Sequence, residues 1–243
     1  MYQANYRNRS GLRRARGCVS GILVLLVILG GVIFLVARAR SGVTVSVGAH
    51  PTIIGTECDG TLTVFAGPAN QVTLWGIFPM YNQDSASNTI TLNSCDGGMT
   101  LTVPAETNIT LDTNAGNILV FGVSGTMDLS SNGGNITLIQ STLEGHSKVD
   151  NNGAPIIFSG NLAQGSVTDL SGNSGSIDVT LPGATSFNLE VSGIVGPFIS
   201  NVPAIKITPD ESSVPAVNVG SNPSYASLQL DLNDTVVLLR SGS

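Results

Sequence analysis

Charged side chains, aromatic side chains and histidine are all scarce in this 243-residue chain. Charged residues make up 11% of it and aromatic residues 5%, and the only histidines are His50 and His146. Two histidines do not support a histidine-based metal cluster or a catalytic triad. The sequence also lacks a P-loop, a nucleophile elbow and a dinucleotide-binding fingerprint. We therefore expect no enzyme activity, no catalytic residue and no cofactor.

Acidic residues are absent from the first forty positions, which carry seven arginines. Residues 41–243 hold all sixteen acids and three basic residues (Lys148, Lys206 and Arg240), so this part has a formal charge of −13. Nucleic acid binding requires a basic surface. We therefore expect no nucleic acid partner.

One apolar segment is long enough to cross a lipid bilayer. Residues 18–37 contain no charged side chain, and twenty helical residues span about 30 Å, the thickness of the hydrocarbon core. Five arginines precede the segment and two follow it, which favours a cytoplasmic N-terminus. We predict a basic tail over 1–17, a transmembrane helix over 18–37 and a linker over 38–42, in a single-pass cell-membrane protein.

A cleaved secretory signal is the alternative for the same segment. Ala37-Arg38-Ala39 has the small-x-small form of a cleavage site. However, the apolar run exceeds a usual signal core of about 7–15 residues, and arginines flank the site. An uncleaved anchor remains the favoured interpretation.

From residue 43 onward the sequence favours strands. Residues 43–47 (VTVSV), 61–65 (TLTVF) and 99–103 (MTLTV) alternate in period two, and Gly, Asn, Asp and Pro separate such runs. We predict an extracytoplasmic all-β domain over 43–243. Its proline-rich end, about 183–243, is expected to cap an exposed strand edge.

Four segments in the middle of the chain repeat one pattern, in which an apolar residue, Asp, a polar stretch with Asn, Gly and Ile follow one another. Their glycines lie 18, 19 and 22 residues apart, and a period near 20 fits one coil of a β-solenoid, or β-helix. We expect glycines with positive φ at the corners and asparagines that bond along the stack. The repeated glycines are Gly116, Gly134, Gly153 and Gly175. The isoleucines expected to form an inward ladder are Ile118, Ile136, Ile156 and Ile177. The asparagines are Asn114, Asn132, Asn152 and Asn173.

Two of the three cysteines occupy equivalent positions in a second repeat. Cys58-Asp-Gly and Cys95-Asp-Gly both precede a Thr-Leu-Thr-Val run, 37 residues apart. We predict a Cys58–Cys95 disulfide in an oxidising compartment. Two full coils would separate the Cα atoms by about 9–10 Å, beyond the usual reach of about 7 Å. The bridge therefore requires one irregular coil between them, for which residues 67–88 are the candidate.

Four aspartates recur just before the glycines, and three interpretations of them stay open. They are Asp112, Asp128, Asp150 and Asp169. Aspartate is a common turn residue that bonds nearby backbone amides. A stacked column of carboxylates would alternatively bind Ca²⁺, or act on a polysaccharide as in some β-helix enzymes.

The succession LDTNAGNILV, DLSSNGGNITL, VDNNGAPIIFSG and DLSGNSGSIDVTLP resembles the "putative adhesin" family of bacterial β-strand-repeat proteins. The resemblance is clearest over 108–182, and it implies a β-helix-like fold on the cell surface after an N-terminal membrane segment. We accordingly predict a binding, adhesive or envelope-structural role toward an extracellular protein or glycan ligand. The alternatives are a membrane-anchored sensor and a carbohydrate-active β-helix enzyme.

Overall fold

The computed structural model describes residues 42–76, 79–95, 97–193, 197–202, 205, 213–221 and 225–242. These residues form strands and turns, and within them no helix has the length and apolar character that a membrane crossing requires. The predicted tail over 1–17, the predicted transmembrane helix over 18–37 and most of the predicted linker lie outside the described residues. The all-β prediction for the rest is confirmed.

The strands join into one open hydrogen-bonded network. Their bounds are β1 Val43–Ser46, β2 Thr52–Cys58, β3 Leu62–Gly67, β4 Gln71–Gly76, β5 Met80–Asp84, β6 Thr89–Ser94, β7 Met99–Pro104, β8 Asn108–Thr113, β9 Ile118–Phe121, β10 Ser124–Gly125, β11 Met127–Ser131, β12 Ile136–Leu143, β13 His146–Asn151, β14 Ile156–Leu162, β15 Val167–Pro182, β16 Phe187–Ser192, β17 Phe198–Ser200, β18 Ser213–Val219 and β19 Ala226–Gly242.

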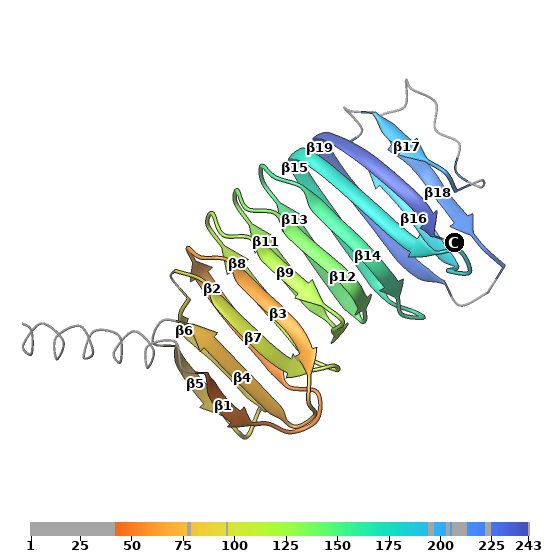
Figure 1. Ribbon diagram of the computed structural model, residues 1–243. Helices are drawn as coiled ribbons and strands as arrows, with labels where there is room; N and C mark the ends of the chain where they lie inside the picture. The colour runs from red at the N-terminus through yellow and green to blue at the C-terminus, as the bar shows by residue number, and fades with distance from the viewer. Residues whose placement is uncertain are drawn as a thin grey trace, which may run out of the picture. The chain divides into compact units, whose positions relative to one another are not determined.

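Two long rows of paired strands make up most of this network (Figure 1). A short third row pairs β10 with the last residues of β12, which in turn pair with the end of β14. Ladder A runs in the order β5, β6, β2, β8, β11, β13, the first half of β15, the first half of β19, β16 and β18. Ladder B runs in the order β1, β4, β7, β3, β9, β12, β14, the second half of β15, the second half of β19 and β17. The central pairs in both ladders are parallel, and antiparallel pairs lie toward the ends.

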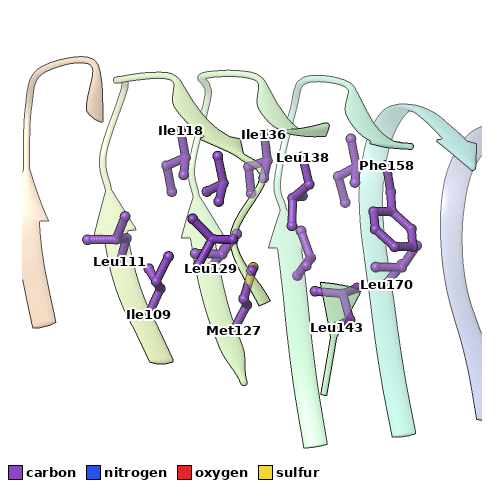
Figure 2. Close-up of a cluster of buried hydrophobic side chains, with 14 of the residues drawn as sticks. Ile109, Leu111, Ile118, Met127, Leu129, Ile136, Leu138, Leu143, Phe158 and Leu170 are labelled. Atoms are coloured by element: carbon purple, nitrogen blue, oxygen red, sulfur yellow. The ribbon is translucent and has the colours of Figure 1, made fainter. Parts of the chain in front are cut away.

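The core lies between the two ladders because each strand buries alternate residues. Strand β8 buries Ile109 and Leu111 from ladder A, while β12 buries Ile136 and Leu138 from ladder B. Figure 2 shows such side chains from both ladders meeting between the strands. A period of two with one face buried is the signature of strands that pack one face on a core. The two opposite faces are left on the outside of the stack.

The order of strands in the stack differs from their order in the chain at both ends. Strand β2 lies between β6 and β8, although β6 comes later in the sequence. The final strand, β19, lies between β15 and β16 in ladder A. We expected 183–243 to cap the stack, but its last strand is internal. The strands outside it, β16, β17 and β18, precede it in the chain.

Candidate functional site

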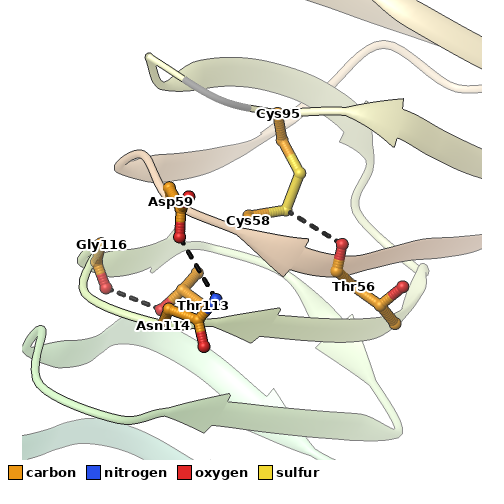
Figure 3. Close-up of a disulfide and its surroundings, with 7 residues drawn as sticks. All are labelled: Thr56, Cys58, Asp59, Cys95, Thr113, Asn114 and Gly116. Carbon is orange, nitrogen blue, oxygen red and sulfur yellow. Dashed lines mark hydrogen bonds between the residues drawn. A yellow bond between two sulfur atoms is a disulfide. The ribbon is translucent and has the colours of Figure 1, made fainter.

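The structure joins Cys58, at the end of β2, and Cys95, just after β6, in a disulfide (Figure 3). Their Cα atoms are 5.1 Å apart. The irregular coil expected over residues 67–88 is present, because β4 and β5 in this segment pair antiparallel and β6 returns directly beside β2. The disulfide therefore links β2 and β6, which are neighbours in the stack although they are not consecutive in the chain.

The four repeated isoleucines share one inward column of ladder B. Ile118 pairs with Ile136, Ile136 with Ile156 and Ile156 with Ile177. Each side chain is fully buried or nearly so. Leu62 and Val237 continue the same column on either side. These residues therefore hold the fold together and are not exposed to a ligand.

The glycines act through close backbone packing more than through positive φ. Of the four that we singled out, only Gly175 has a positive φ, of 116°. A β-carbon on Gly116 would overlap the carbonyl oxygen of Gly60, and one on Gly134 would overlap that of Gly116. The backbones of successive turns thus leave no room for a side chain at these two positions.

Gly153 does not belong to this glycine column. A β-carbon there would have the Asn132 carbonyl oxygen, 3.9 Å away, as its nearest neighbour. The next residue, Ala154, is the one that approaches Gly175, since a β-carbon on Gly175 would lie 2.8 Å from the Ala154 carbonyl oxygen. The sequence alignment was therefore wrong by one residue in this repeat.

Asparagine side chains form an exposed hydrogen-bonded ladder at one corner of the stack. The Asn152 amide donates to the Asn132 side-chain oxygen at 2.8 Å, Asn173 donates to Asn152 at 2.5 Å, and Asn233 donates to Asn173 at 2.7 Å. Asn114 instead donates to the Asp59 carboxylate at 3.2 Å (Figure 3). The repeat pattern does not single out Asn233, because β19 lies outside the four repeats.

Buried polar residues support the same corner from inside, and sequence reasoning missed them. The Thr113 hydroxyl donates to the Gly116 carbonyl oxygen at 2.8 Å, and the Asn151 amide donates to that of Gly134 at 2.8 Å. Buried backbone carbonyls need such partners, because an unpaired one loses its hydrogen bond to water. The available signal was the polar residue that directly precedes the repeated asparagine, such as Thr113 before Asn114.

The four aspartates lie on the outer face of ladder A, but they do not form one column. Asp112 and Asp150 share a column with Ser130 between them, whereas Asp128 and Asp169 share a neighbouring column with Lys148 between them. Aspartates in one column are thus two strand spacings apart, about 9.6 Å. The single column of carboxylates that we considered for Ca²⁺ or catalysis is therefore wrong, and the described residues contain no group of three or more side chains placed to hold a metal ion.

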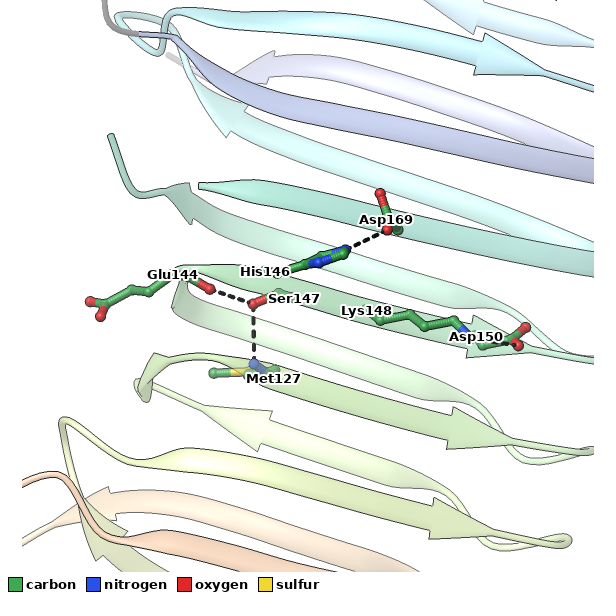
Figure 4. Close-up of polar contacts among 7 residues, drawn as sticks. All are labelled: Met127, Glu144, His146, Ser147, Lys148, Asp150 and Asp169. Atoms are coloured by element: carbon green, nitrogen blue, oxygen red, sulfur yellow. Dashed lines mark hydrogen bonds and ion pairs between the residues drawn. The ribbon is translucent and has the colours of Figure 1, made fainter. Parts of the chain in front are cut away.

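Basic side chains neutralise part of this acidic face (Figure 4). The His146 ring nitrogen lies 2.8 Å from an Asp169 carboxylate oxygen, and the Lys148 ammonium lies 3.8 Å from Asp150. His146 is a surface residue, with its side chain 71% exposed. A hollow of about 370 Å³ opens beside these pairs, and its charged lining residues are Lys148, Asp169, Glu190 and Asp231. The outer face of ladder A is therefore polar and charged.

The outer face of ladder B has a different chemistry. Its outward residues from β1 to β14 carry no charge. Large apolar side chains are exposed there instead, with Trp75 48% exposed and Phe65 41% exposed. Phe65 stacks on Phe121 of the neighbouring strand with ring centroids 5.0 Å apart. The outer face of ladder B is thus uncharged from β1 to β14, and the Asp178–Arg240 ion pair on β15 and β19 brings charge to the same face farther along the stack.

No family model matches the chain, and no curated protein matches its sequence. Solved structures do resemble it. A putative cell adhesion protein from Clostridium sporogenes has a TM-score of 0.51 at 10% identity, over 84% of this chain and 100% of that one. A putative adhesin from Bacteroides fragilis has a TM-score of 0.42 at 13% identity, over 83% of this chain and 96% of that one. The first likeness shows a shared all-β fold.

Proposed function

We propose that this chain is a single-pass membrane protein with a β-solenoid on the outer side of a cell membrane, where the solenoid binds an extracellular protein or glycan. The tail over 1–17 would lie in the cytoplasm, residues 18–37 would span the bilayer and 38–42 would link the anchor to the solenoid. The proposal includes no catalytic step.

The observation that carries the binding role is the pair of long outer faces. The inward residues of the strands fill the core, so the outward residues of both ladders remain available for contact. An extended, regular surface of this kind is how stacked-repeat proteins bind their partners. The fold shared with a protein described as a putative cell adhesion protein supports the same role.

The arrangement of the aspartates favours binding over catalysis. Lys148 separates Asp128 from Asp169 in their column, and two of the four carboxylates lie beside a basic side chain. Carboxylates paired in this way stabilise the strand surface and fix its charge pattern. A charged face on ladder A and an uncharged surface over β1 to β14 of ladder B suit selection of a partner by its surface chemistry.

Tags at the two ends of the full chain test this proposal in intact bacteria. We expect an antibody to reach a C-terminal tag before lysis and an N-terminal tag only after lysis. A variant without residues 18–37 should no longer fractionate with membranes. Cells that display the chain should retain more of a panel of soluble glycans and matrix proteins than cells without it. A C-terminal tag that becomes accessible only on lysis would refute the topology, and equal retention by both cell types would refute the binding role.

A further inference from the structure

Six side chains on the outer face of ladder B form a regular grid, which we call the aromatic–threonine grid. Strand β7 runs between β4 and β3, and the pairing registers align two rows of three residues. One row is Trp75, Thr100 and Thr63, and the other is Thr73, Thr102 and Phe65. The two aromatic residues therefore occupy opposite corners, about 12 Å apart by strand geometry, and four threonines fill the remaining positions.

The backbone beneath Trp75 fixes the position of its ring. A β-carbon on Gly42 would lie 2.7 Å from the indole ring, so the ring rests directly against the glycine backbone. Nearly half of the Trp75 side chain nevertheless remains exposed. Phe65 is held in a comparable way, because one face of its ring stacks on Phe121. Both aromatic corners are thus pre-positioned, which lowers the entropy cost of binding a ligand.

The threonines between the corners offer hydroxyl groups to the outside. The Thr73 hydroxyl shares a hydrogen bond of 3.1 Å with that of Thr44. The hydroxyls of Thr63, Thr100 and Thr102 have no side-chain hydrogen-bond partner among the described residues, and each of these residues is partly exposed. A threonine hydroxyl both donates and accepts. The grid therefore presents neutral donors and acceptors between two aromatic surfaces.

This chemistry identifies the class of ligand. A pyranose ring has an apolar C–H face, which packs on an aromatic ring, and hydroxyl groups at its edge, which bond to threonine hydroxyls. Anionic ligands are disfavoured because the grid contains no basic side chain and residues 41–243 have a formal charge of −13. We propose that the aromatic–threonine grid binds a neutral polysaccharide along β4, β7 and β3. This inference rests on the proposed binding function and deepens it by naming the surface and the ligand class.

Trp75 is the only tryptophan of the chain, so its fluorescence reports directly on the grid. The full chain, in detergent, would be titrated with soluble glucan, mannan and xylan, and in parallel with anionic alginate. We expect at least one neutral polymer to shift or quench the Trp75 emission with saturation, and alginate to have no effect. Phe65→Ala and Thr100→Val should each weaken binding about tenfold. Trp75→Ala, followed by pull-down on the immobilised polymer, should weaken it at least as much.

Matched controls separate the grid from the rest of the surface. Thr137→Val removes an outward hydroxyl from the same outer face on β12, and Ile199→Ala removes an apolar side chain on β17 that is 57% exposed. Both variants should bind like the wild type. The far-UV circular dichroism and the urea midpoint of every variant should match the wild type, so that lost binding is not lost folding.

Four outcomes would overturn the inference. The first is that no neutral polymer binds while the displayed chain still retains a protein ligand, which would leave the proposed function standing. The second is glycan binding that Phe65→Ala and Trp75→Ala leave unchanged. The third is concentration-dependent dimerisation that Phe65→Ala abolishes, because the grid would then contact a second copy. The fourth is quenching of Trp75 by spin-labelled phospholipids in vesicles that hold the chain, because the grid would then face lipid.

Discussion

Cys58 and Cys95 are 37 residues apart in the chain, yet they end neighbouring parallel strands and are joined by a disulfide. The bridge ties β2, which lies inside the stack, to β6, which the chain reaches only after two antiparallel strands. Such a covalent link closes a loop in the unfolded chain and so lowers the conformational entropy of the unfolded state. It therefore stabilises the end of the stack at which the strand order is not sequential.

Removal of this disulfide should lower the free energy of unfolding. For a loop of this length the chain-entropy estimate is about 3–4 kcal/mol. The double variant Cys58→Ala and Cys95→Ala, measured by urea unfolding, should show this loss, and reduced wild type should behave like it. Cys18→Ser serves as the control and should match the wild type. Free thiols at both positions in the unreduced protein, detected by iodoacetamide labelling, would contradict the bridge.

Local patterns in the sequence predict the strands and the inward isoleucine column, because period-two alternation directly encodes which face is buried. They do not predict which strands are neighbours. Pairing of β2 with β6 depends on how the chain returns through β4 and β5, and no local motif specifies this return. The disulfide prediction therefore named the right cysteines and the irregular segment between them, but not the strand pairing that brings them together.

Repeats of unequal length limit how well individual positions can be aligned. The spacing between repeated glycines varies from 18 to 22 residues, so alignment by the nearest glycine shifted Gly153 by one place. The four aspartates lie three to six residues before these glycines, and this variation places them in two columns. The aromatic–threonine grid was hidden for a related reason. Its six residues come from three strands whose adjacency only the structure reveals.

Gly134 and Gly153 give a matched test of the close backbone packing. A β-carbon on Gly134 would overlap the Gly116 carbonyl oxygen, whereas one on Gly153 would meet only ordinary contact at 3.9 Å. Gly134→Ala should therefore lower the free energy of unfolding by about 1–3 kcal/mol or more. Gly153→Ala should leave it unchanged or raise it by up to about 1 kcal/mol. Urea unfolding of both variants checks the contrast, and equal losses would show that the two glycines are equivalent after all.

Ile136 and Ile157 compare the inner and outer faces of ladder B. Ile136 is fully buried in the isoleucine column, while Ile157, on the neighbouring strand β14, is 39% exposed. Ile136→Ala should lower the free energy of unfolding by about 2–5 kcal/mol because it leaves a cavity in the core. Ile157→Ala should cost much less, since its side chain already contacts water. A larger loss at Ile157 in chemical denaturation would mean that the two faces had been assigned the wrong way round.

The Asp84 carboxylate makes the stability of the turn after β5 depend on pH, because it accepts hydrogen bonds within that turn. Hydrogen bonds from the Ser87 hydroxyl, first, and from the Ala86 amide hold the pKa of this carboxyl below its ordinary value. A lowered folded-state pKa means that the carboxylate contributes stability above its unfolded pKa of about 3.9 and loses it as the pH falls through the folded-state pKa. Asp84→Asn should therefore lower the melting temperature at about pH 6 and have little effect in strong acid. A difference between the two proteins that stays constant from neutral to acidic pH would contradict this assignment.

The Asn152 side chain makes two hydrogen bonds in the asparagine ladder. Substitutions at this position test whether these bonds contribute to the free energy of unfolding. The Asn152 amide donates to Asn132 and its oxygen accepts from Asn173, so Asn152→Ala removes both bonds. Asn152→Asp keeps an acceptor for Asn173 and removes the donor toward Asn132. Because the ladder is exposed, each bond should contribute about 0.5–1.5 kcal/mol, and the alanine variant should lose more than the aspartate variant in urea unfolding. Asn161→Ala, an exposed change on β14 outside the ladder, is the control. If all three variants lose the same free energy, the ladder bonds add nothing beyond an ordinary surface side chain.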